Sequence, residues 1–373
     1  MKRFTFGMPE KMVPSRFCDG FRYVETDVNY PAANFTFKKI PSGCVLEFPI
    51  EDDCHIFGFG LQLKQFDHRG RKLRLDVNAD PVGADGESHA PVPFFVTNKG
   101  YGMYFDTARY AEFYCGKQKN TGKNTAKSSG GSAGSEAELY AVRQDTGLVM
   151  SVRIPVAAGV DVYVIEGDSI TDIVSQYNRL AGGGPEVPEW SLGMLYRCYY
   201  QWNAEKIKSI ADDFMERNIP CNIIGLEPGW HTHAYSCTYK WSDKYPNPDA
   251  FISYLRERNY HLSLWEHAFV HPDAEIHDAL APYSGDWLVW GGLVPDFATE
   301  EGRKTFADYH REKLVDHGID GFKLDECDSS DFTGVGASHC PPNFLPGWTG
   351  SSIIRCSARC MPKPCWTPWG SRK

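Results

Sequence analysis

The sequence lacks a long apolar run, a targeting segment and an excess of basic residues. No window of about eighteen uncharged apolar residues occurs, which excludes a membrane-spanning helix. The first residues include basic side chains but no apolar stretch, so we expect no secretion signal and a cytoplasmic location. The formal charge of −9 argues against a protein that follows nucleic-acid phosphates. We therefore expect neither a membrane nor a nucleic acid as a partner.

Signatures of metal and dinucleotide sites are also absent. The 12 cysteines include no paired Cys-x-x-Cys sets, and without a secretion signal we expect reduced thiols. His231 and His233 lie close together, but no third ligand has suitable spacing, so we expect no metal. No Gly-x-Gly-x-x-Gly follows a predicted strand, which leaves a dinucleotide site without support. We expect no cofactor.

Residues 1–186 carry the pattern of an all-β domain. Several short segments are rich in β-branched or aromatic residues and are bounded by Gly, Pro or Asn: Gly43–Phe48, Val92–Val96, Tyr101–Tyr104 and Leu148–Ile154. Gly100 can supply the positive φ of a hairpin turn between two of them. Short strands at this spacing predict an antiparallel β-sandwich. The polar, Gly/Ser-rich residues 116–136 predict an exposed mobile loop.

From residue 187 the pattern changes to alternating strands and helices. Four apolar segments predict strands: Ser191–Tyr200, Cys221–Glu227, His261–Ala268 and Ile319–Glu326. Helices are expected at Ala204–Arg217 after the N-cap Asn203, after Asn247 with Pro248 at the first helical position, and after Thr299. Strand, helix, strand, helix implies parallel strands with crossovers, either in an open doubly wound sheet or in a barrel. We expect residues 187–334 to form the first half of a (β/α)8 TIM barrel.

Residues 335–373 differ in kind from the rest. No Asp or Glu follows Asp331, although the chain has 48 acidic residues. The segment holds four cysteines whose spacing matches no metal-ligand pattern: Cys340, Cys356, Cys360 and Cys365. A zinc-binding or disulfide-linked tail is the alternative to a frame slip in the coding sequence after about Gly334. We expect an anomalous tail, disordered or frame-shifted.

The most informative chemical feature is the run from Asp320 to Asp328, which ends the fourth predicted strand. Because side chains alternate along a strand, Lys323 and Asp325 share one face. In a barrel they point into the mouth at the C-terminal face, where such enzymes place their sites. Lys323 favours the charged form of Asp325, and an ionised carboxylate there suits attack on a sugar C1. The alternative is a solvated acidic loop.

Two neighbouring strand ends support a sugar site. Glu227 and Trp230 follow the second strand, while Trp265 and His267 close the third. Polar and aromatic side chains converging at strand ends describe a pocket for a polyhydroxylated ligand. A single His or Trp at such a position is more often part of a core. The convergence of three strand ends favours the pocket.

The sequence resembles glycoside hydrolase family 31, the retaining α-glycosidases, from about Gly58 to Asp331. The matching stretches are Phe59-Gly60-Leu61, Val77–Asp80, Val92–Gly102, Glu189–Gly193, Val294–Thr299 and the run that contains Lys323-Leu324-Asp325. The resemblance implies an N-terminal β-sandwich and a catalytic barrel. It places the nucleophile on Asp325 and a supporting acidic residue on Asp328. A second carboxylic acid is expected to protonate the leaving oxygen.

Family precedent implies that Lys323 and Glu227 bind sugar hydroxyls beside the scissile bond. The α-glucosidases usually carry Asp at the second position, so Glu227 is a departure. Its extra methylene moves the carboxylate by about a bond length, which favours a different hydroxyl configuration. Gluco, galacto and N-acetylgalacto substrates therefore all stay open. The expected partner is an α-linked oligosaccharide or glycoside, with no linkage or oligomeric state assigned.

The resemblance implies an acid/base carboxylate well beyond the nucleophile, on a later barrel strand. We expect no counterpart in this chain, because no acidic residue follows Asp331. A whole barrel takes about 250 residues, whereas only about 145 lie between Pro188 and Gly334, enough for four strands of eight. Our hypothesis is an incomplete, inactive product whose unclosed barrel exposes an edge and dissolves poorly. Two other classes stay open: a non-catalytic carbohydrate-binding protein, and a metal-dependent barrel hydrolase acting on esters or amides.

Overall fold

A computed structural model of the chain divides it into two compact units. It describes residues 1–10, 24–78, 81, 83, 85–118, 147–183 and 187–326, and the backbone of 343–344 and 348–349. Unit 1 comprises Met1–Glu10, Glu25–Asp76 and Gly83–Val174, and unit 2 comprises Lys11–Val24, Val77–Val82 and Ser175–Lys373. The boundary expected at residue 186 stays a prediction.

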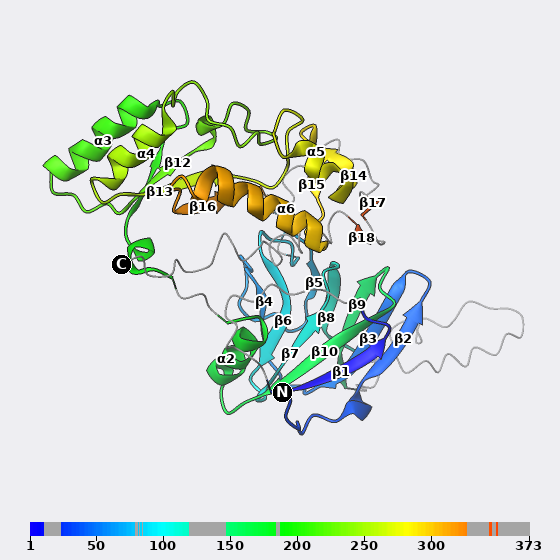
Figure 1. Cartoon of the computed structure of the whole chain (residues 1–373). Coiled ribbons are helices and arrows are strands. Elements are labelled where there is room, and N and C mark those ends of the chain that lie inside the picture. Colours follow the sequence, from blue (N-terminus) through cyan, green and yellow to red (C-terminus); the bar gives the residue numbers. More distant parts are fainter. Residues whose placement is uncertain are drawn as a thin grey trace, which may run out of the picture. The chain divides into compact units, whose positions relative to one another are not determined.

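Unit 1 contains two five-stranded antiparallel sheets (Figure 1). The first has the order β1 (Lys2–Gly7), β10 (Gly159–Glu166), β7 (Tyr101–Asp106), β6 (Pro91–Thr97) and β4 (Ile56–Gly60). The second has the order β2 (Thr36–Ile40), β3 (Gly43–Ile50), β9 (Leu148–Pro155), β8 (Ala111–Gln118) and β5 (Lys72–Leu75), and a 3-10 turn, η1 (Ala32–Asn34), precedes it.

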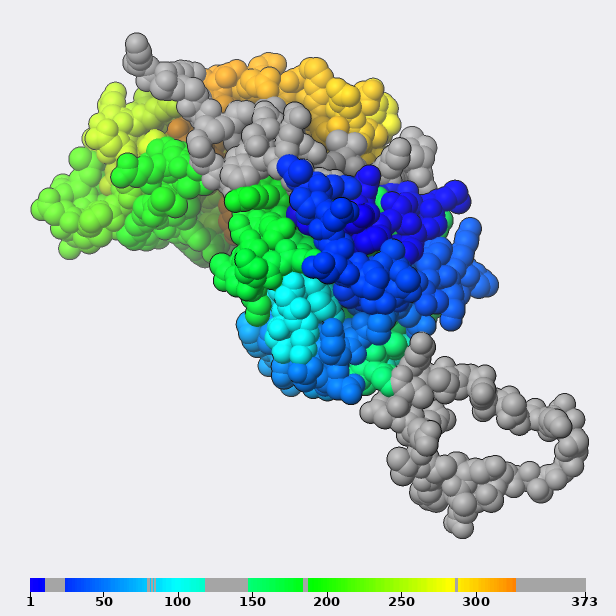
Figure 2. Space-filling view, turned by 90° about the horizontal axis from the view of Figure 1, so that it is seen from below, coloured from blue at the N-terminus to red at the C-terminus, as the bar shows by residue number. Residues whose placement is uncertain are grey.

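Both sheets of unit 1 contribute to one aromatic core. Phe48 on β3 lies 6.4 Å, centroid to centroid, from Phe95 on β6 and from Phe105 on β7. Phe113 on β8 meets Phe105 edge to face at 5.2 Å. This shared core confirms the predicted sandwich. Figure 2 shows part of the surface of unit 1. There, cyan residues near position 100 lie beside blue residues of earlier strands, as the pairing of β4 with β6 requires.

Two local predictions for unit 1 have different outcomes. The turn between β6 and β7 is formed, and Gly100 has the expected positive φ of 76°. The loop expected at 116–136 is wrong at its start, because Gly116, Lys117 and Gln118 continue β8. A register shift between Cys115 and Lys117 lets the strand accept Gly116, whose φ is 96°, and keep pairing with β9. Residues 119–136 lie outside the described residues.

Unit 2 is built on a four-stranded parallel sheet. Its order is β11 (Leu195–Cys198), β12 (Ile223–Leu226), β13 (His261–Glu266) and β16 (Gly321–Leu324). These strands fall within the four predicted segments, and all three pairings are parallel. Within the described residues β11 and β16 are edge strands, so the sheet does not close. The fold class is therefore confirmed as a sandwich followed by part of a barrel.

The helices of unit 2 begin at the caps that the sequence predicts. Asn203 and Asn247 accept backbone hydrogen bonds at the starts of α3 and α4, and Thr299 does so for α6. The helices and turns are α2 (Ile170–Leu180), which spans the division between the units, η2 (Glu189–Leu192), α3 (Ala204–Glu216), η3 (Pro228–Trp230), α4 (Pro248–Arg256), α5 (His277–Leu280), η4 (Ala281–Tyr283), α6 (Glu300–His310) and the π-helical η5 (Arg311–Val315). In the described part of the chain, none of the helices has the length and apolar character of a membrane span.

Two hairpins are elements that the sequence reading did not foresee. β14 (Ser284–Val289) pairs antiparallel with β15 (Gly292–Pro295) between β13 and α6. β17 (Asn343–Phe344) pairs with β18 (Trp348–Thr349) inside the segment expected to be an anomalous tail. The rest of residues 335–373 lies outside the described residues, so the tail interpretation stays a prediction.

The N-cap of α3 allows a direct test of local stability. Asn203 Oδ1 accepts a hydrogen bond of 3.0 Å from the backbone N–H of Lys206. Asn203→Ala removes this acceptor and should lower the free energy of unfolding of unit 2 by about 1 kcal/mol. All 10 tryptophans lie at or after Trp190, so tryptophan fluorescence during urea unfolding reports unit 2 and no part of unit 1. Ser209→Ala, on the exposed face of α3, is the control and should leave the midpoint unchanged within error.

Candidate active site

The strand register of unit 2 brings the predicted site residues of two strands together. Trp265 on β13 is the direct partner of Lys323 on β16. The backbone N–H of Asp325 donates to the carbonyl of Glu266 at 2.8 Å and extends this pairing past the end of β16. Because the two strands are parallel, their carboxyl ends meet at one edge of the sheet. Trp265, Lys323 and Asp325 are therefore neighbours.

The carboxylate of Asp325 is held by two donors at the same oxygen. The indole Nε1–H of Trp265 donates to Asp325 Oδ2 at 2.7 Å, and Lys323 Nζ lies 3.0 Å from Oδ2. Burial alone would raise the pKa of Asp325. The hydrogen bond from Trp265 and the ammonium of Lys323 outweigh burial and hold the pKa below its usual value. Asp325 is thus an ionised, half-buried carboxylate at neutral pH.

The chain turns sharply after Asp325. Glu326 has a φ of 58°, a left-handed conformation that costs a non-glycine residue about 1–2 kcal/mol. The hydroxyl of Tyr235 donates to Glu326 Oε1 at 3.3 Å, and burial raises the pKa of Tyr235 to about 12. The Tyr235 ring lies 5.4 Å from the indole of Trp265. Sequence reasoning missed Tyr235, because it stands in a loop with no periodic signal.

Glu227, at the end of β12, is clamped by an arginine that the sequence analysis did not select. Arg197 donates through Nε to Glu227 Oε1 at 2.8 Å and through Nη2 to Oε2 at 2.6 Å. Glu227 and the charge of Asp325 both raise the pKa of Arg197, so the guanidinium lies within electrostatic reach of Asp325. The signal was available: Arg197 is a charged residue inside the first predicted strand.

Trp230, predicted to contact sugar, is fully buried in the structure. Its Nε1–H donates to the carbonyl of Trp265 at 2.7 Å, and His231 Nε2 lies 3.1 Å from the same oxygen. The turn that carries Trp230 depends on Gly229, since a Cβ there would overlap the carbonyl oxygen of Tyr200. The structure gives Trp230 a packing position, and its contact with sugar stays a prediction.

His267 is likewise fully buried, on the chain that leaves β13. Its Nδ1 accepts the backbone N–H of Phe269 at 3.2 Å and lies 3.5 Å from the thiol of Cys237. Burial lowers the pKa of His267 to about 4, so the ring is neutral at pH 7. Its predicted sugar contact also stays a prediction. Asp328, the expected supporting acid, lies outside the described residues.

The buried histidines predict an acid-sensitive unit 2. Burial lowers the pKa of His231 to about 3 and that of His267 to about 4, from a usual value of 6.5. Below pH 6.5 the unfolded chain binds protons that the folded chain does not, so stability falls on acidification. Each histidine should lower the free energy of unfolding by about 1.4 kcal/mol for every pH unit between 6.5 and its pKa in the folded chain. Urea unfolding followed by tryptophan fluorescence at pH 7 and pH 5.5 measures the loss.

The control for this pH effect is an exposed histidine. His317 pairs with Asp249 at the surface, and its side chain is 52% exposed. His317→Gln should leave the difference between the two pH values nearly intact, whereas His267→Gln should reduce it. Equal stability of the unmodified chain at pH 7 and pH 5.5 would contradict the assignment of both rings as neutral.

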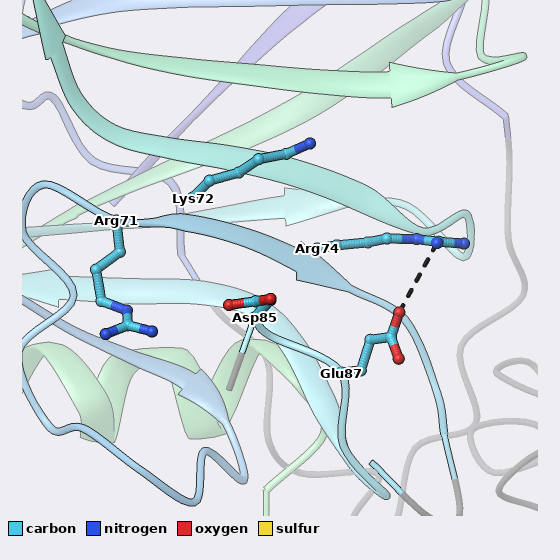
Figure 3. A pocket seen from close by; sticks show the side chains of 5 residues that line it. All are labelled: Arg71, Lys72, Arg74, Asp85 and Glu87. Atoms are coloured by element: carbon cyan, nitrogen blue, oxygen red, sulfur yellow. Dashed lines mark ion pairs between the residues drawn. The ribbon is translucent and has the colours of Figure 1, made fainter. Parts of the chain in front are cut away.

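Asp325 lines neither of two hollows found in the structure. The hollow in unit 1, about 480 Å³ in volume, is lined by Arg71, Lys72, Arg74, Asp85 and Glu87 (Figure 3). The hollow in unit 2, about 390 Å³, is lined by Gln201, Trp202, Asn203, Lys206, Asp243 and Lys244. Arg74 pairs with Glu87 at 3.7 Å and Lys72 pairs with Glu112 at 2.8 Å, so the first hollow offers little uncompensated charge. The carboxylate of Asp325 and its donors, rather than a cavity, identify the candidate site.

The described residues contain no group of three or more His, Cys, Asp or Glu that could hold a metal ion. His231 and His233, the pair weighed in the sequence, have other partners. His231 contacts the carbonyl of Trp265, and His233 Nδ1 lies 2.8 Å from the carbonyl of Ser236.

Two domain profiles match the chain. The "Glycosyl hydrolases family 31 TIM-barrel domain" matches residues 184–350. The "Glycosyl hydrolase 31 N-terminal galactose mutarotase-like domain" matches residues 20–113. The first match contains Glu227, Trp265 and Asp325, and the second contains several strands of the sandwich.

Characterised relatives and solved structures agree with these profiles. An α-xylosidase of Emericella nidulans is 22% identical over 75% of this chain and 34% of its own length. Alpha-glucosidase 2 of Bacillus thermoamyloliquefaciens is 24% identical over 80% of this chain and 36% of its own length. A family 31 dextranase of Flavobacterium johnsoniae, complexed with glucose, superposes with a TM-score of 0.68 at 19% identity, over 90% of this chain and 39% of that one. The chain spans about a third of the length of the curated relatives.

Proposed function

The chain belongs to glycoside hydrolase family 31, and on that premise we propose that its site acts on α-glycosidic bonds with Asp325 as the nucleophile. The observation that carries the proposal is the ionised carboxylate of Asp325, which accepts from Trp265 at 2.7 Å and lies 3.0 Å from Lys323 Nζ. A nucleophile must be ionised before it meets its substrate, and these two donors keep Asp325 in that form.

The reaction is a double displacement at the anomeric carbon. An oxygen of Asp325 bonds to C1 while the bond from C1 to the leaving oxygen breaks, and a carboxylic acid protonates that oxygen. Water then attacks C1, the ester to Asp325 breaks, and the acid residue, now a base, takes the proton. In retaining enzymes the two carboxyl groups lie about 5–5.5 Å apart. The acid/base residue is the one part of this scheme that we assign to no described residue.

The proposed substrate is an α-linked oligosaccharide or glycoside. Relatives of this chain bear the names α-xylosidase and α-glucosidase, and a structural neighbour was solved with isomaltotriose. In this chain Arg197 holds both carboxylate oxygens of Glu227, which supports a rigid hydrogen-bond acceptor for a sugar hydroxyl. We propose Glu227 and Lys323 as hydroxyl-binding residues, with the preference among gluco, xylo, galacto and N-acetylgalacto configurations set by Glu227.

Covalent labelling tests the proposal without the acid/base residue. A 5-fluoro-α-glycosyl fluoride has a leaving group that departs as fluoride without protonation, so only the nucleophile must act. Incubation of the 373-residue chain with gluco, xylo, galacto and N-acetylgalacto forms should give one stable ester. Peptide mass spectrometry should place that ester on Asp325. Labelling at another carboxylate, or none with any of the four sugars, would contradict the proposal.

Chelation separates this proposal from a metal-dependent hydrolase. If the site acts through Asp325, dialysis against EDTA should leave the rate of labelling unchanged within error, because no step needs a Lewis acid. A metal-dependent hydrolase should lose activity on esters or amides and regain it with added divalent metal. Loss of Asp325 labelling after EDTA, restored by metal, would favour that alternative. The cytoplasmic location expected from the sequence stays a prediction.

A further inference from the structure

We propose that Trp265 is the positioning residue of the nucleophile: its indole N–H fixes Asp325 Oδ2 and leaves Oδ1 as the attacking oxygen. The inference rests on the proposed function for the attack itself, and on the geometry alone for the placement of the carboxylate. It changes the role of Trp265 from the sugar contact expected from the sequence to a donor that acts through Asp325.

Both side-chain donors to Asp325 converge on one oxygen. Trp265 Nε1 lies 2.7 Å from Oδ2, and Lys323 Nζ lies 3.0 Å from the same atom. Among the described residues, no side chain donates to Oδ1. An oxygen that accepts two charge-assisted hydrogen bonds is the less nucleophilic of the pair, because its lone pairs are already engaged. Neither of these side chains holds Oδ1, and the backbone of Glu326 adds a further hydrogen bond to the carboxyl group. Oδ1 is therefore the oxygen that bonds to C1 in this proposal.

The backbone carbonyl of Trp265 is itself fixed by two side chains. Its carbonyl oxygen accepts the indole N–H of Trp230 at 2.7 Å and lies 3.1 Å from His231 Nε2. The backbone N–H of Tyr239 donates to His231 Nδ1 at 3.2 Å, so Nδ1 is the acceptor and Nε2 carries the proton toward Trp265. Two donors thus engage both lone pairs of one carbonyl and fix the backbone that aims the indole. The side chains of Trp265, Trp230 and His231 are all buried.

This arrangement explains why Trp230 and His231 are buried at a strand end that the sequence marks as a sugar pocket. The chain of contacts runs from the turn after β12, through the carbonyl of Trp265, to its indole and then to Asp325. A carboxylate positioned in this way does not need to reorganise when substrate binds, which is the condition for an efficient attack. Trp230 and His231 act on the reaction only through Trp265.

Trp265 is an uncharged side chain among the groups that determine the pKa of Asp325. Among the described residues, the charged and titratable side chains that interact with Asp325 are Lys323, Arg197, His267 and Tyr235, and the adjacent Glu326 pairs with Tyr235. None of these is changed by Trp265→Phe, which keeps an aromatic ring and removes the N–H. A shift in the titration of Asp325 in this variant therefore reports the lost hydrogen bond.

The experiment measures the titration of Asp325 directly. A water-soluble carbodiimide with an added amine converts protonated carboxyl groups to amides, and peptide mass spectrometry gives the extent at Asp325 against pH. The comparison is confined to the pH range in which tryptophan fluorescence shows unit 2 to be folded. At the lowest pH of that range, the extent of amide formation at Asp325 should be several-fold greater in Trp265→Phe than in the unmodified chain, as expected for a midpoint about one pH unit higher. The control is Trp190→Phe, whose indole stacks on His261 at the opposite end of β13 and should give no shift. An unchanged midpoint in folded Trp265→Phe would overturn the proposal.

A second measurement decides the matter if Trp265→Phe does not fold. Asp325→Asn is nearly isosteric and removes the charge that Trp265 faces. In ¹⁵N-labelled protein, one indole N–H resonance should move upfield in Asp325→Asn, and the same resonance in the unmodified chain should titrate with Asp325. If no indole resonance responds to either change, the hydrogen bond is absent and the proposal fails.

The two proposals fail separately. If Asp325 titrates as described but never forms a glycosyl ester, the positioning by Trp265 stands and the proposed function fails. If Asp325 forms the ester, its labelling rate at saturating reagent should fall at least tenfold in Trp265→Phe, with the half-saturating concentration nearly unchanged. A change confined to the half-saturating concentration would return Trp265 to the role of a sugar contact and overturn the positioning role.

Discussion

Asp325→Asn should abolish covalent labelling by 5-fluoro-α-glycosyl fluorides, with a fall in rate of at least about 10⁴-fold. The amide nitrogen and oxygen of asparagine are weak nucleophiles, and the neutral side chain cannot form the ester at C1. The substitution keeps the shape of the side chain and one acceptor oxygen for the indole of Trp265. The measurement is the rate of mass increase of the intact protein with each of the four sugars.

The matched control is an aspartate on the surface of the same unit. Asp273 has a side chain that is 84% exposed, so Asp273→Asn should label at the rate of the unmodified chain. Sugar binding in Asp325→Asn, measured by calorimetry, separates an enzyme from a carbohydrate-binding protein. Retained binding with lost labelling supports catalysis by Asp325. Undiminished labelling in Asp325→Asn would place the nucleophile elsewhere.

The fold could be predicted where local patterns and chain topology agree. Short segments rich in β-branched or aromatic residues predicted β3, β6, β7 and β9, and the caps at Asn203, Asn247 and Thr299 predicted three helices. Parallel strands follow from the strand–helix alternation, because a crossover leaves no other compact arrangement. β1 was missed although its side chains alternate between half-buried and exposed, because it is short and pairs with β10, at the far end of the unit in sequence.

The site could be predicted where it depends on side-chain parity, which is the alternation of side chains between the two faces of a strand. Parity along β13 and β16 puts Trp265, Lys323 and Asp325 on one face, and the register of the two strands makes them neighbours. Parity does not tell a side chain that faces a ligand from one that packs behind another residue. Trp230 and His267 were therefore expected at the surface of a pocket and lie buried instead.

Arg197 and Tyr235 were missed for a different reason. Each acts through a partner that is distant in sequence: Arg197 through Glu227, 30 residues away, and Tyr235 through Glu326, 91 residues away. A charge inside a predicted strand marks Arg197 as unusual, but patterns in a single sequence describe neighbours along one element and do not identify the distant partner. Only the assembled sheet shows that the carboxylates at the ends of β12 and β16 have partners from other segments.

The pair of Arg197 and Glu227 gives the second large expected effect. Glu227→Gln should lower the labelling rate about 10²-fold with the preferred sugar, because an amide cannot accept both hydrogen bonds of the guanidinium and turns away from the sugar. Arg197→Met should cause a similar loss by freeing the carboxylate of Glu227. In the double variant the loss should be no greater than in either single variant, since both remove one shared geometry.

The same variants show whether Glu227 selects the configuration of the sugar. If Glu227 accepts from one hydroxyl, the loss should fall mainly on the sugar that places a hydroxyl there and leave its epimer nearly unaffected. Arg311→Met is the matched control, since Arg311 pairs with Asp308 and its side chain is 49% exposed. If the losses of the two single variants multiply in the double variant, the two residues act independently. If the losses are equal for all four sugars, Glu227 acts in the reaction rather than in the recognition of the sugar.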